Sequence, residues 1–396
     1  MGEAQVPGPR RWSPKGTDLR KGWGTGLKRT GLGCLPAGLF CASHLRGLRS
    51  CWRRPESGGL FKGCENLQLV EKQIMTSKWT ETIGTTCFNQ LTDADAIHKS
   101  IEKIRESERT VISILTARSY AQRQLIAVEY RKISGKELKD DLKTDLTGNF
   151  ERLLKALITS PALFDAKQLK KAMQNLRNDA NVLIEILITR NNKQLKEISQ
   201  SYFTEYKKSL VDDITSQTSG YFRKGLLFLA EAKRDESLEV NKSLAKKDAQ
   251  SLYDAGEKKW GTDEDKFLEI LCLRSFSQLR LIFEEYKIIS QREIEDSIKR
   301  EMSGHLAELL LAIVNCVKNT PAFFAEKLYK ALKDTETDKW ALNRIIISRS
   351  ETDLLDIQTE YKKQYGSSLH TAIKASQSHV CGRYETVLMN ICSKDN

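Results

Sequence analysis

Proline is scarce in this chain, and most of its few copies lie at one end. The sequence of 396 residues contains 7 prolines and 23 glycines, of which five prolines and 13 glycines precede residue 75. After that point the only prolines are Pro161 and Pro321. Since proline interrupts helices, so low a content fits an all-helical body. The Gly/Pro-rich segment 1–74 is predicted to be a disordered extension.

Signatures of catalytic and zinc sites are also missing. Neither HExxH, GxSxG nor a P-loop occurs, and the 9 cysteines show no CxxC spacing. The histidines form no paired arrangement, and they are His44, His98, His305, His370 and His379. We therefore predict that the protein is not an enzyme, that it lacks a zinc site, and that it is cytoplasmic with reduced thiols. His305 is interpreted as a residue at the start of a helix.

Long apolar runs and a basic folded body are absent as well. No stretch of 18 consecutive apolar residues exists, so the sequence predicts no membrane-spanning segment. The net charge is +12, but residues 1–74 hold 13 Lys and Arg against five Asp and Glu. The remainder is nearly neutral, so we predict no nucleic-acid partner.

The basic segment 1–74 has three interpretations. The mildly apolar stretch "TGLGCLPAGLFCAS", residues 30–43, allows a secretory signal, and the low acid content allows a transit peptide. The interpretation we favour is an upstream extension without a folded role, because Met75 opens "MTSKWTETIG", which looks like a natural start.

A unit of about 70 to 80 residues occurs four times. The segments that align are "ILTARSYAQRQLIAVEY", "ILITRNNKQLKEISQSY", "ILCLRSFSQLRLIFEEY" and "IIISRSETDLLDIQTEY". Each has Arg at its fifth position, namely Arg118, Arg190, Arg274 and Arg349, and each ends in Tyr. A second shared block, such as "EMSGHLAELLLAIV", follows in the first three units. Apolar residues recur every three and four positions, so each unit is predicted to be a small bundle of helices.

The repeats suggest boundaries along the chain. We predict that Ser160 and Thr320 cap helices that begin at Pro161 and Pro321. The acid pairs Asp140/Asp141 and Asp212/Asp213 recur at the same place in their units, which indicates caps or salt bridges rather than catalysis. The predicted segments are an extension at 1–74, an amino-terminal arm at 75–88, and repeats at 89–160, 161–232, 245–318 and 319–396.

The stretch "AGEKKWGTDED", residues 255–265, differs from its counterparts in the other units. Its glycines would let the backbone turn carbonyl oxygens toward one point, and its acids suggest a cation, although the spacing is not that of an EF-hand. The alternative is that Thr262 and the acids after it only cap a helix. Capping does not account for Gly256, Gly261 and Glu301 at their spacing.

The fourfold unit, the "GTDED" loop, and the "SG" block forty residues later resemble annexins over about residues 85–396. The resemblance implies an all-α fold of four repeats with about five helices each, arranged as a slightly curved disc. It further implies a protein that is monomeric in solution and binds acidic phospholipid membranes peripherally through Ca²⁺. Carried onto this sequence, the family's ligands are the backbone carbonyls of Gly256, Lys259 and Gly261 and the carboxylate of Glu301. Trp260 would contact the membrane at the tip of the loop.

The other three repeats depart from the family's loop, which reads approximately Lys/Arg-Gly-x-Gly-Thr. They read "EKIRES", "QNLRND" and "KDTETD", so charged or polar residues replace the glycines. We predict that these three loops hold no high-affinity calcium. Lys103, Arg105 and Arg177 could instead attract anionic lipid, or could be ordinary solvated charges.

Two functions follow from this reading. The first is calcium-dependent binding to acidic phospholipid, mainly through repeat 3. The alternative is a largely calcium-insensitive interaction scaffold that binds protein partners through the arm at 75–88.

Overall fold

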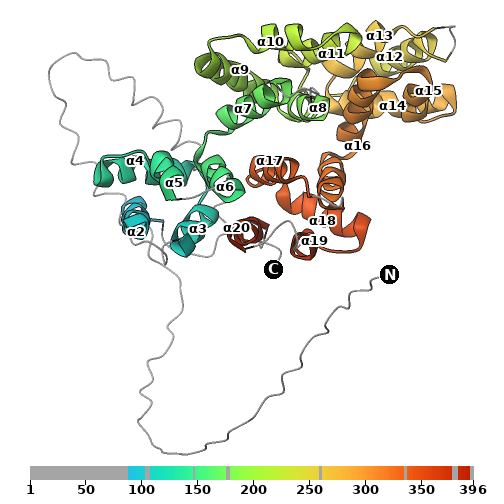
Figure 1. Ribbon diagram of the computed structural model, residues 1–396. Coiled ribbons are helices and arrows are strands. Elements are labelled where there is room, and N and C mark those ends of the chain that lie inside the picture. Colours follow the sequence, from blue (N-terminus) through green and yellow to red (C-terminus); the bar gives the residue numbers. More distant parts are fainter. Residues whose placement is uncertain are drawn as a thin grey trace, which may run out of the picture. The chain divides into compact units, whose positions relative to one another are not determined.

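The computed structural model describes residues 88–102, 108–145, 148–174, 179–257, 261–333, 337–376 and 382–392. All of these described residues belong to one compact unit. These described ranges contain helices and no strands (Figure 1), which confirms the predicted fold class. The extension at 1–74 and nearly all of the arm at 75–88 lie outside the described residues.

The helices fall into four sets of five. The first set is α2 (Gln90–Glu102), α3 (Glu108–Ala117), α4 (Tyr120–Ser134), α5 (Leu138–Asp145) and α6 (Gly148–Ile158). The second is α7 (Pro161–Gln174), α8 (Ala180–Thr189), α9 (Asn192–Tyr206), α10 (Leu210–Gln217) and α11 (Gly220–Ala230). The third is α12 (Lys242–Ala255), α13 (Glu264–Leu273), α14 (Phe276–Ser290), α15 (Ile294–Glu301) and the first part of α16 (Gly304–Lys333). The fourth is the rest of α16, α17 (Lys339–Arg349), α18 (Leu354–Tyr365), α19 (Leu369–Ala375) and α20 (Gly382–Cys392).

Each repeat is held together by its first and third helices, which pack side by side as α2 with α4, α7 with α9, α12 with α14 and α16 with α18. The tyrosine that ends each repeated segment lies in this contact, and Tyr130, Tyr202, Tyr286 and Tyr361 are at most 2% exposed. Burial of a side chain of this size contributes on the order of 2 kcal/mol, so these tyrosines are main elements of the four cores.

Three of these tyrosine hydroxyls form a hydrogen bond with the residue 11 positions later in the chain. The Tyr130 hydroxyl donates to Asp141 at 2.7 Å, and the Tyr202 hydroxyl donates to Asp213 at 2.5 Å. In the third repeat Ser297 replaces the aspartate and accepts from Tyr286 at 2.9 Å. Asp213 also forms an ion pair with Lys170. The prediction of a structural role for the acid pairs is therefore confirmed for Asp141 and Asp213.

The repeated arginine lies at or just after the end of the second helix of each unit, and in the first three repeats it pairs with an aspartate on the first helix. Arg118 with Asp93, Arg190 with Asp165, and Arg274 with Asp248 each form two hydrogen bonds between guanidinium and carboxylate. Such bidentate pairs fix orientation as well as distance, so they hold the two helices at one angle. In the fourth repeat Phe324 occupies the position of the aspartate, and Arg349 pairs with Asp353 instead.

Helix α16 joins the third and fourth repeats. Asn319 interrupts it with non-helical φ −160° and ψ 98°, and the Asn319 side chain accepts from the backbone of Ala322 at 3.0 Å. The predicted cap at Thr320 was therefore wrong by one residue, because the Thr320 hydroxyl donates back to the Cys316 carbonyl. The predicted cap at Ser160 is confirmed, since its hydroxyl accepts from the backbone of Leu163.

By length and composition α16 is the one described helix that could cross a membrane. It passes this test because two helices are merged across the break at Asn319. Its apolar residues, including Leu310, Ile313 and Phe324, are buried in the protein. We therefore interpret α16 as a core helix of the third and fourth repeats.

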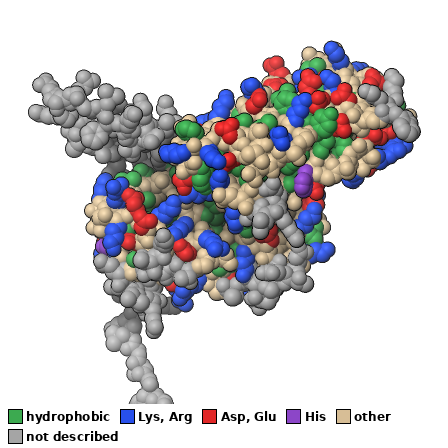
Figure 2. All heavy atoms as spheres, turned by 45° about the horizontal axis from the view of Figure 1, so that its top comes forward, with side chains coloured by type: hydrophobic (Ala, Val, Ile, Leu, Met, Phe, Trp, Pro, Cys, Tyr) green, Lys and Arg blue, Asp and Glu red, His purple; other side chains and the backbone are tan. Residues whose placement is uncertain are grey.

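Contacts between repeats come in two groups. The second and third repeats meet through α8, α11, α13 and α16, and the first and fourth meet through α3, α6, α17 and α20 (Figure 1). Helices α7 and α17 also touch, which links the second repeat to the fourth. On the face drawn in Figure 2, positive and negative side chains interleave, as expected from the nearly neutral body.

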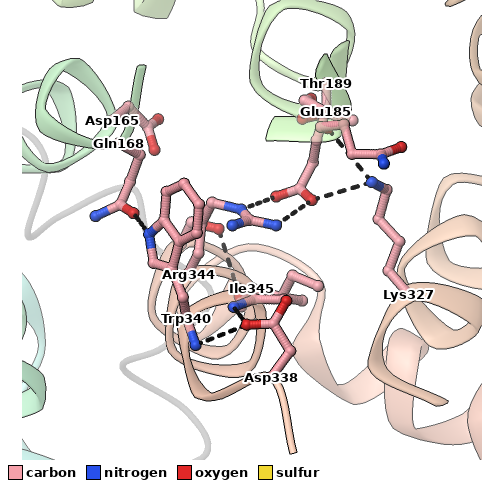
Figure 3. A network of polar contacts seen from close by, with 12 residues as sticks. Asp165, Gln168, Glu185, Thr189, Lys327, Asp338, Trp340, Arg344 and Ile345 are labelled. Atoms are coloured by element: carbon pink, nitrogen blue, oxygen red, sulfur yellow. Dashed lines mark hydrogen bonds and ion pairs between the residues drawn. The ribbon is translucent and has the colours of Figure 1, made fainter. Parts of the chain in front are cut away.

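A buried charge network strengthens the link between the second and fourth repeats (Figure 3). Glu185 on α8 is 0% exposed and accepts from Nε and Nη2 of Arg344 on α17, at 2.9 and 3.0 Å. Lys327 on α16 lies 3.3 Å from the same carboxylate. Burial opposes ionisation of Glu185, but Arg344 and Lys327 outweigh it and lower the pKa to about 2.

Candidate functional site

The loop between α12 and α13 carries the residues that sequence analysis singled out. Its described parts are Gly256 and Glu257 on one side and residues from Gly261 onward on the other. Lys259 and Trp260 lie outside the described residues, and so do Lys103, Arg105 and Arg177 in the other repeats. The same holds for most of the corresponding loops, at 103–107, 175–178 and 334–336.

The two glycines of this loop have different conformations. Gly256 follows α12 with φ −113° and ψ −93°, and its N–H donates to the Leu252 carbonyl at 3.1 Å. Gly261 has φ +85°, a left-handed conformation that other residues rarely adopt. A side chain at position 261 would therefore strain the backbone, whereas position 256 has ordinary negative φ.

Glu301 ends α15 and lies next to the start of α13. The Thr262 hydroxyl donates to the Glu301 side chain at 3.3 Å and lies 3.4 Å from its backbone carbonyl. The N–H of Asp263 donates to the Ala255 carbonyl at 2.8 Å, which closes the loop at its base. The fold thus brings Glu301 next to Gly261 and Thr262, although Glu301 follows them by about forty residues along the chain.

The helix cap in this loop is Asp263 rather than Thr262. The Asp263 side chain accepts from the backbone of Lys266 at 3.2 Å, and α13 begins at Glu264. The Thr262 hydroxyl faces Glu301 instead. Helix capping therefore explains Asp263. It does not explain the contact between Thr262 and Glu301.

The Glu301 carboxylate has one weak contact in the described part of the chain. Apart from the 3.3 Å contact with Thr262, no donor there lies within hydrogen-bond or ion-pair distance of this side chain. The neighbouring Arg300 pairs with Glu257 instead, at 3.5 Å. A half-buried carboxylate with so little hydrogen bonding has lone pairs to offer to a cation.

Sequence analysis missed the role of Glu257. Its carboxylate accepts from the Ser297 hydroxyl at 2.8 Å and pairs with Arg292 at 3.2 Å, and its side chain is 15% exposed. Ser297 in turn accepts from Tyr286. A chain of hydrogen bonds therefore ties the loop to α15, the helix that carries Glu301. The available signal was Ser297 itself, which stands where two other repeats have aspartate.

No other described cluster competes as a metal site. Nowhere in the described ranges do three His, Cys, Asp or Glu side chains come together as metal ligands. A metal site there would have to use backbone carbonyls, as the loop between α12 and α13 would allow. His305 lies in the first turn of α16, as predicted, and contacts Glu308 at 2.8 Å.

The described cysteines are buried rather than reactive. Cys272, Cys316 and Cys392 are all buried. Burial raises the pKa of the Cys272 thiol to about 12 and raises that of Cys316 as well. Because the thiolate is the reactive form, these residues act as small apolar core residues.

Comparison with known proteins gives one consistent result. The annexin family model matches four segments of this chain, residues 92–157, 164–229, 247–313 and 323–391. Annexin A3 from Mus musculus and annexin A3 from Homo sapiens are each 60% identical to it over 326 residues, which is 81% of this chain and 100% of each relative.

Solved structures agree in fold. The structure of annexin III has a TM-score of 0.76 and 61% identity, and the match covers 78% of this chain and 95% of that one. A calcium-bound structure of annexin (Sm)1 has a TM-score of 0.70 and 32% identity, and the match covers 78% and 91% of the two chains.

Proposed function

Because this chain belongs to the annexin family, we propose that it binds acidic phospholipid membranes in a calcium-dependent manner and that repeat 3 supplies its working calcium site. The family assignment is carried by four matched segments and 60% identity to annexin A3. One observation supports the choice of repeat 3. It is the approach of Thr262, at the end of the glycine-containing loop, to the sparsely bonded carboxylate of Glu301.

The residues of repeat 3 fit a calcium ion. The proposed ligands are the backbone carbonyls of Gly256, Lys259 and Gly261 and the Glu301 carboxylate. Calcium takes six to eight oxygens, so such a set leaves positions for water or a lipid phosphoryl oxygen. When bound, calcium would supply a positive bridge between the loop and the lipid phosphate. The left-handed Gly261 and the bonds from Glu257 to α15 would hold the loop in the binding conformation.

Membrane attachment through a single site has a consequence for avidity. Several weak bridges on one rigid body multiply through effective concentration, whereas one bridge does not. The sequences "EKIRES", "QNLRND" and "KDTETD" lack the glycines of the family loop. Attachment should therefore require more calcium than in an annexin with four intact loops. We propose that Trp260 lies at the loop tip and adds contact with the membrane boundary.

The test is sedimentation of the full chain with phosphatidylserine vesicles across a calcium titration. We expect calcium-dependent pelleting, and we expect Glu301→Gln to raise the half-maximal calcium concentration by at least roughly tenfold, because a neutral amide replaces the charged ligand. Glu284→Gln, at an exposed glutamate on α14, is the matched control and should behave as wild type.

Two outcomes would contradict this proposal. Pelleting that is equal with calcium and with chelator would assign binding to basic residues instead. No pelleting at any calcium concentration would favour the alternative of a protein-interaction scaffold, in which the arm at 75–88 binds partners.

Glu257 is expected to matter although it is not a proposed ligand. Glu257→Ala removes the contacts with Ser297 and Arg292 that tie the loop to α15. A loop that must be ordered on binding has lower affinity, so we expect the half-maximal calcium concentration to rise roughly threefold to tenfold. The same sedimentation assay measures this, with Glu239→Ala as the control at an exposed site. A Glu257→Ala protein with wild-type calcium response would show that the loop needs no such support.

A further inference from the structure

A strongly basic pocket lies where the first, second and fourth repeats meet. It has a volume of about 450 Å³ and is lined by residues of α5, α6, α7 and α17. Pockets that hold small molecules have volumes of roughly 300 to 1,000 Å³. The pocket is separate from the loop between α12 and α13, since no residue of the third repeat lines it.

The charge of this pocket has one sign. Seven of its lining residues are Lys or Arg, and none is Asp or Glu. Three of the seven have carboxylate partners, because Lys155 pairs with Glu151, Lys167 pairs with Glu205, and Arg344 pairs with Glu185. The other four, which have no ion pair with a described residue, are Lys139, Arg152, Lys171 and Lys339. Four cationic side chains that no ion pair with a described residue compensates therefore line one cavity.

Arg344 gives the pocket a buried hydrogen-bond donor without a partner. Its side chain is 4% exposed, and two of its nitrogens bond Glu185. The third nitrogen, Nη1, is buried and has no hydrogen-bond partner among the described residues. Figure 3 shows Glu185 on one side of Arg344 and Trp340 on the other. Since buried donors are nearly always satisfied, this nitrogen can still donate to a water molecule or to a ligand atom.

The neighbouring aromatic residue is already occupied by cations. Lys171 Nζ lies 4.0 Å from the centre of the Trp340 ring, and the Arg344 guanidinium lies 5.4 Å from it. The Trp340 indole N–H donates to Gln168. Trp340 therefore helps to position positive charge beside the pocket.

The lysines of the pocket destabilise one another. Burial lowers the pKa of Lys139, and the charges of Lys167 and Lys155 lower it further. Burial together with Arg152 and Arg344 also lowers the pKa of Lys171, while Asp338 partly opposes this. The Asp338 carboxylate itself caps α17 through the backbone of Trp340 and Ala341. An anion in the pocket would relieve this repulsion.

We propose that this pocket binds a compound carrying several phosphate groups, without calcium. Guanidinium and ammonium groups are the side chains that recognise phosphate, and a ligand with several negative charges matches the uncompensated positive charge. A second pocket, lined by Tyr120, Asn191 and Thr352 among others, differs in its charge. It also contains Asp165, Glu197 and Glu351, so its charges are mixed and it carries no such inference.

The test uses the full chain, tripolyphosphate as the probe, and chelator to remove calcium. A ligand that binds only the folded state raises the melting temperature, whereas binding to the basic segment 1–74 would not stabilise the helical body. Thermal unfolding followed by helical circular dichroism should show a rise of about 4 °C at a roughly hundredfold excess over Kd.

Tripolyphosphate binding is compared between two triple variants. Arg152→Gln, Lys171→Gln and Lys339→Gln remove three uncompensated charges of the pocket, and this variant should bind tripolyphosphate roughly 100-fold more weakly. Lys196→Gln, Lys242→Gln and Lys362→Gln remove the same charge from exposed sites elsewhere and should leave the rise unchanged. Glu301→Gln should also keep the rise, which separates this pocket from the proposed calcium site. No rise in the wild type, or an equal rise in the pocket variant, would overturn the proposal.

A vesicle arm identifies the source of the phosphates. Phosphatidylcholine vesicles containing phosphatidylinositol bisphosphate are sedimented with each protein in chelator, beside phosphatidylcholine alone. Pelleting that the pocket variant loses and the control variant keeps would assign a lipid headgroup to the pocket. If the temperature rise depends on the pocket but pelleting does not, the ligand is a soluble polyphosphate.

Discussion

Replacing Glu185 with alanine should lower the free energy of unfolding by about 3 to 5 kcal/mol and the melting temperature by roughly 5 to 8 °C. The variant would leave Arg344 buried without its carboxylate partner, and it would remove the partner of Lys327 as well. Because Glu185 is on α8 and both cations are on helices of the fourth repeat, the cost falls on the contact between repeats. Thermal unfolding followed by circular dichroism measures it.

A double variant separates the loss of an ion pair from the loss of packing. Glu185→Leu with Arg344→Met replaces the pair with apolar side chains of similar size, and such replacements of buried pairs are often neutral or stabilising. We expect the double variant to recover most of the stability that Glu185→Ala loses. An alanine variant that melts within about 1 °C of wild type would contradict a structural role for this network.

Acid should have the same effect as the substitution. The pKa of Glu185 is lowered from 4.5 to about 2 in the folded protein. Since the unfolded state binds the proton more readily, the contribution of this group is fully present above about pH 4.5 and is lost as the pH falls toward 2. The difference between the two pKa values corresponds to about 3 kcal/mol. Wild-type protein should therefore lose more stability than Glu185→Ala over this pH range.

The repeats and their helices were predictable because they follow from the local spacing of apolar residues along the chain. Four aligned segments with Arg at the fifth position and Tyr at the end gave the second and third helices of every unit. The partners of these residues were less visible. Asp93 and Asp165 each lie 25 residues before their arginines, with a loop of different sequence between them, so only the fold shows that they pair.

The geometry around the candidate calcium site agrees in part with what the sequence suggested. The left-handed Gly261 and the approach of Glu301 to Thr262 agree with the spacing of the sequence. The support from Glu257 was not predicted, because a glutamate in a loop gives no sign of which helix it will contact, and the only signal was the indirect one from Ser297. The basic pocket could not be predicted either, because Lys139, Arg152 and Lys339 come from three helices in two repeats and only the fold brings them together.

The fourth repeat departs from the others at a pair of positions, and this predicts an unequal response to mutation. At the position four residues after the repeated arginine, the first three units have glutamine, whereas the fourth has Asp353. Phe324 has replaced the aspartate on the first helix, and its ring lies 4.7 Å from the Arg349 guanidinium. Asp353 therefore accepts the two hydrogen bonds that Arg349 would otherwise donate to the first helix, at 2.7 and 2.6 Å.

Asp353→Ala should therefore cost about 3 kcal/mol, because it leaves the 8% exposed Arg349 side chain with an uncompensated charge. The matched control is Gln194→Ala, at the same place in the second repeat. Gln194 only completes a capping box with Asn191, so its loss should cost about 1 kcal/mol. Melting temperatures of the two variants give the comparison. Equal costs would mean that Arg349 does not depend on Asp353 and that the exchange of aspartate for Phe324 was compensated elsewhere.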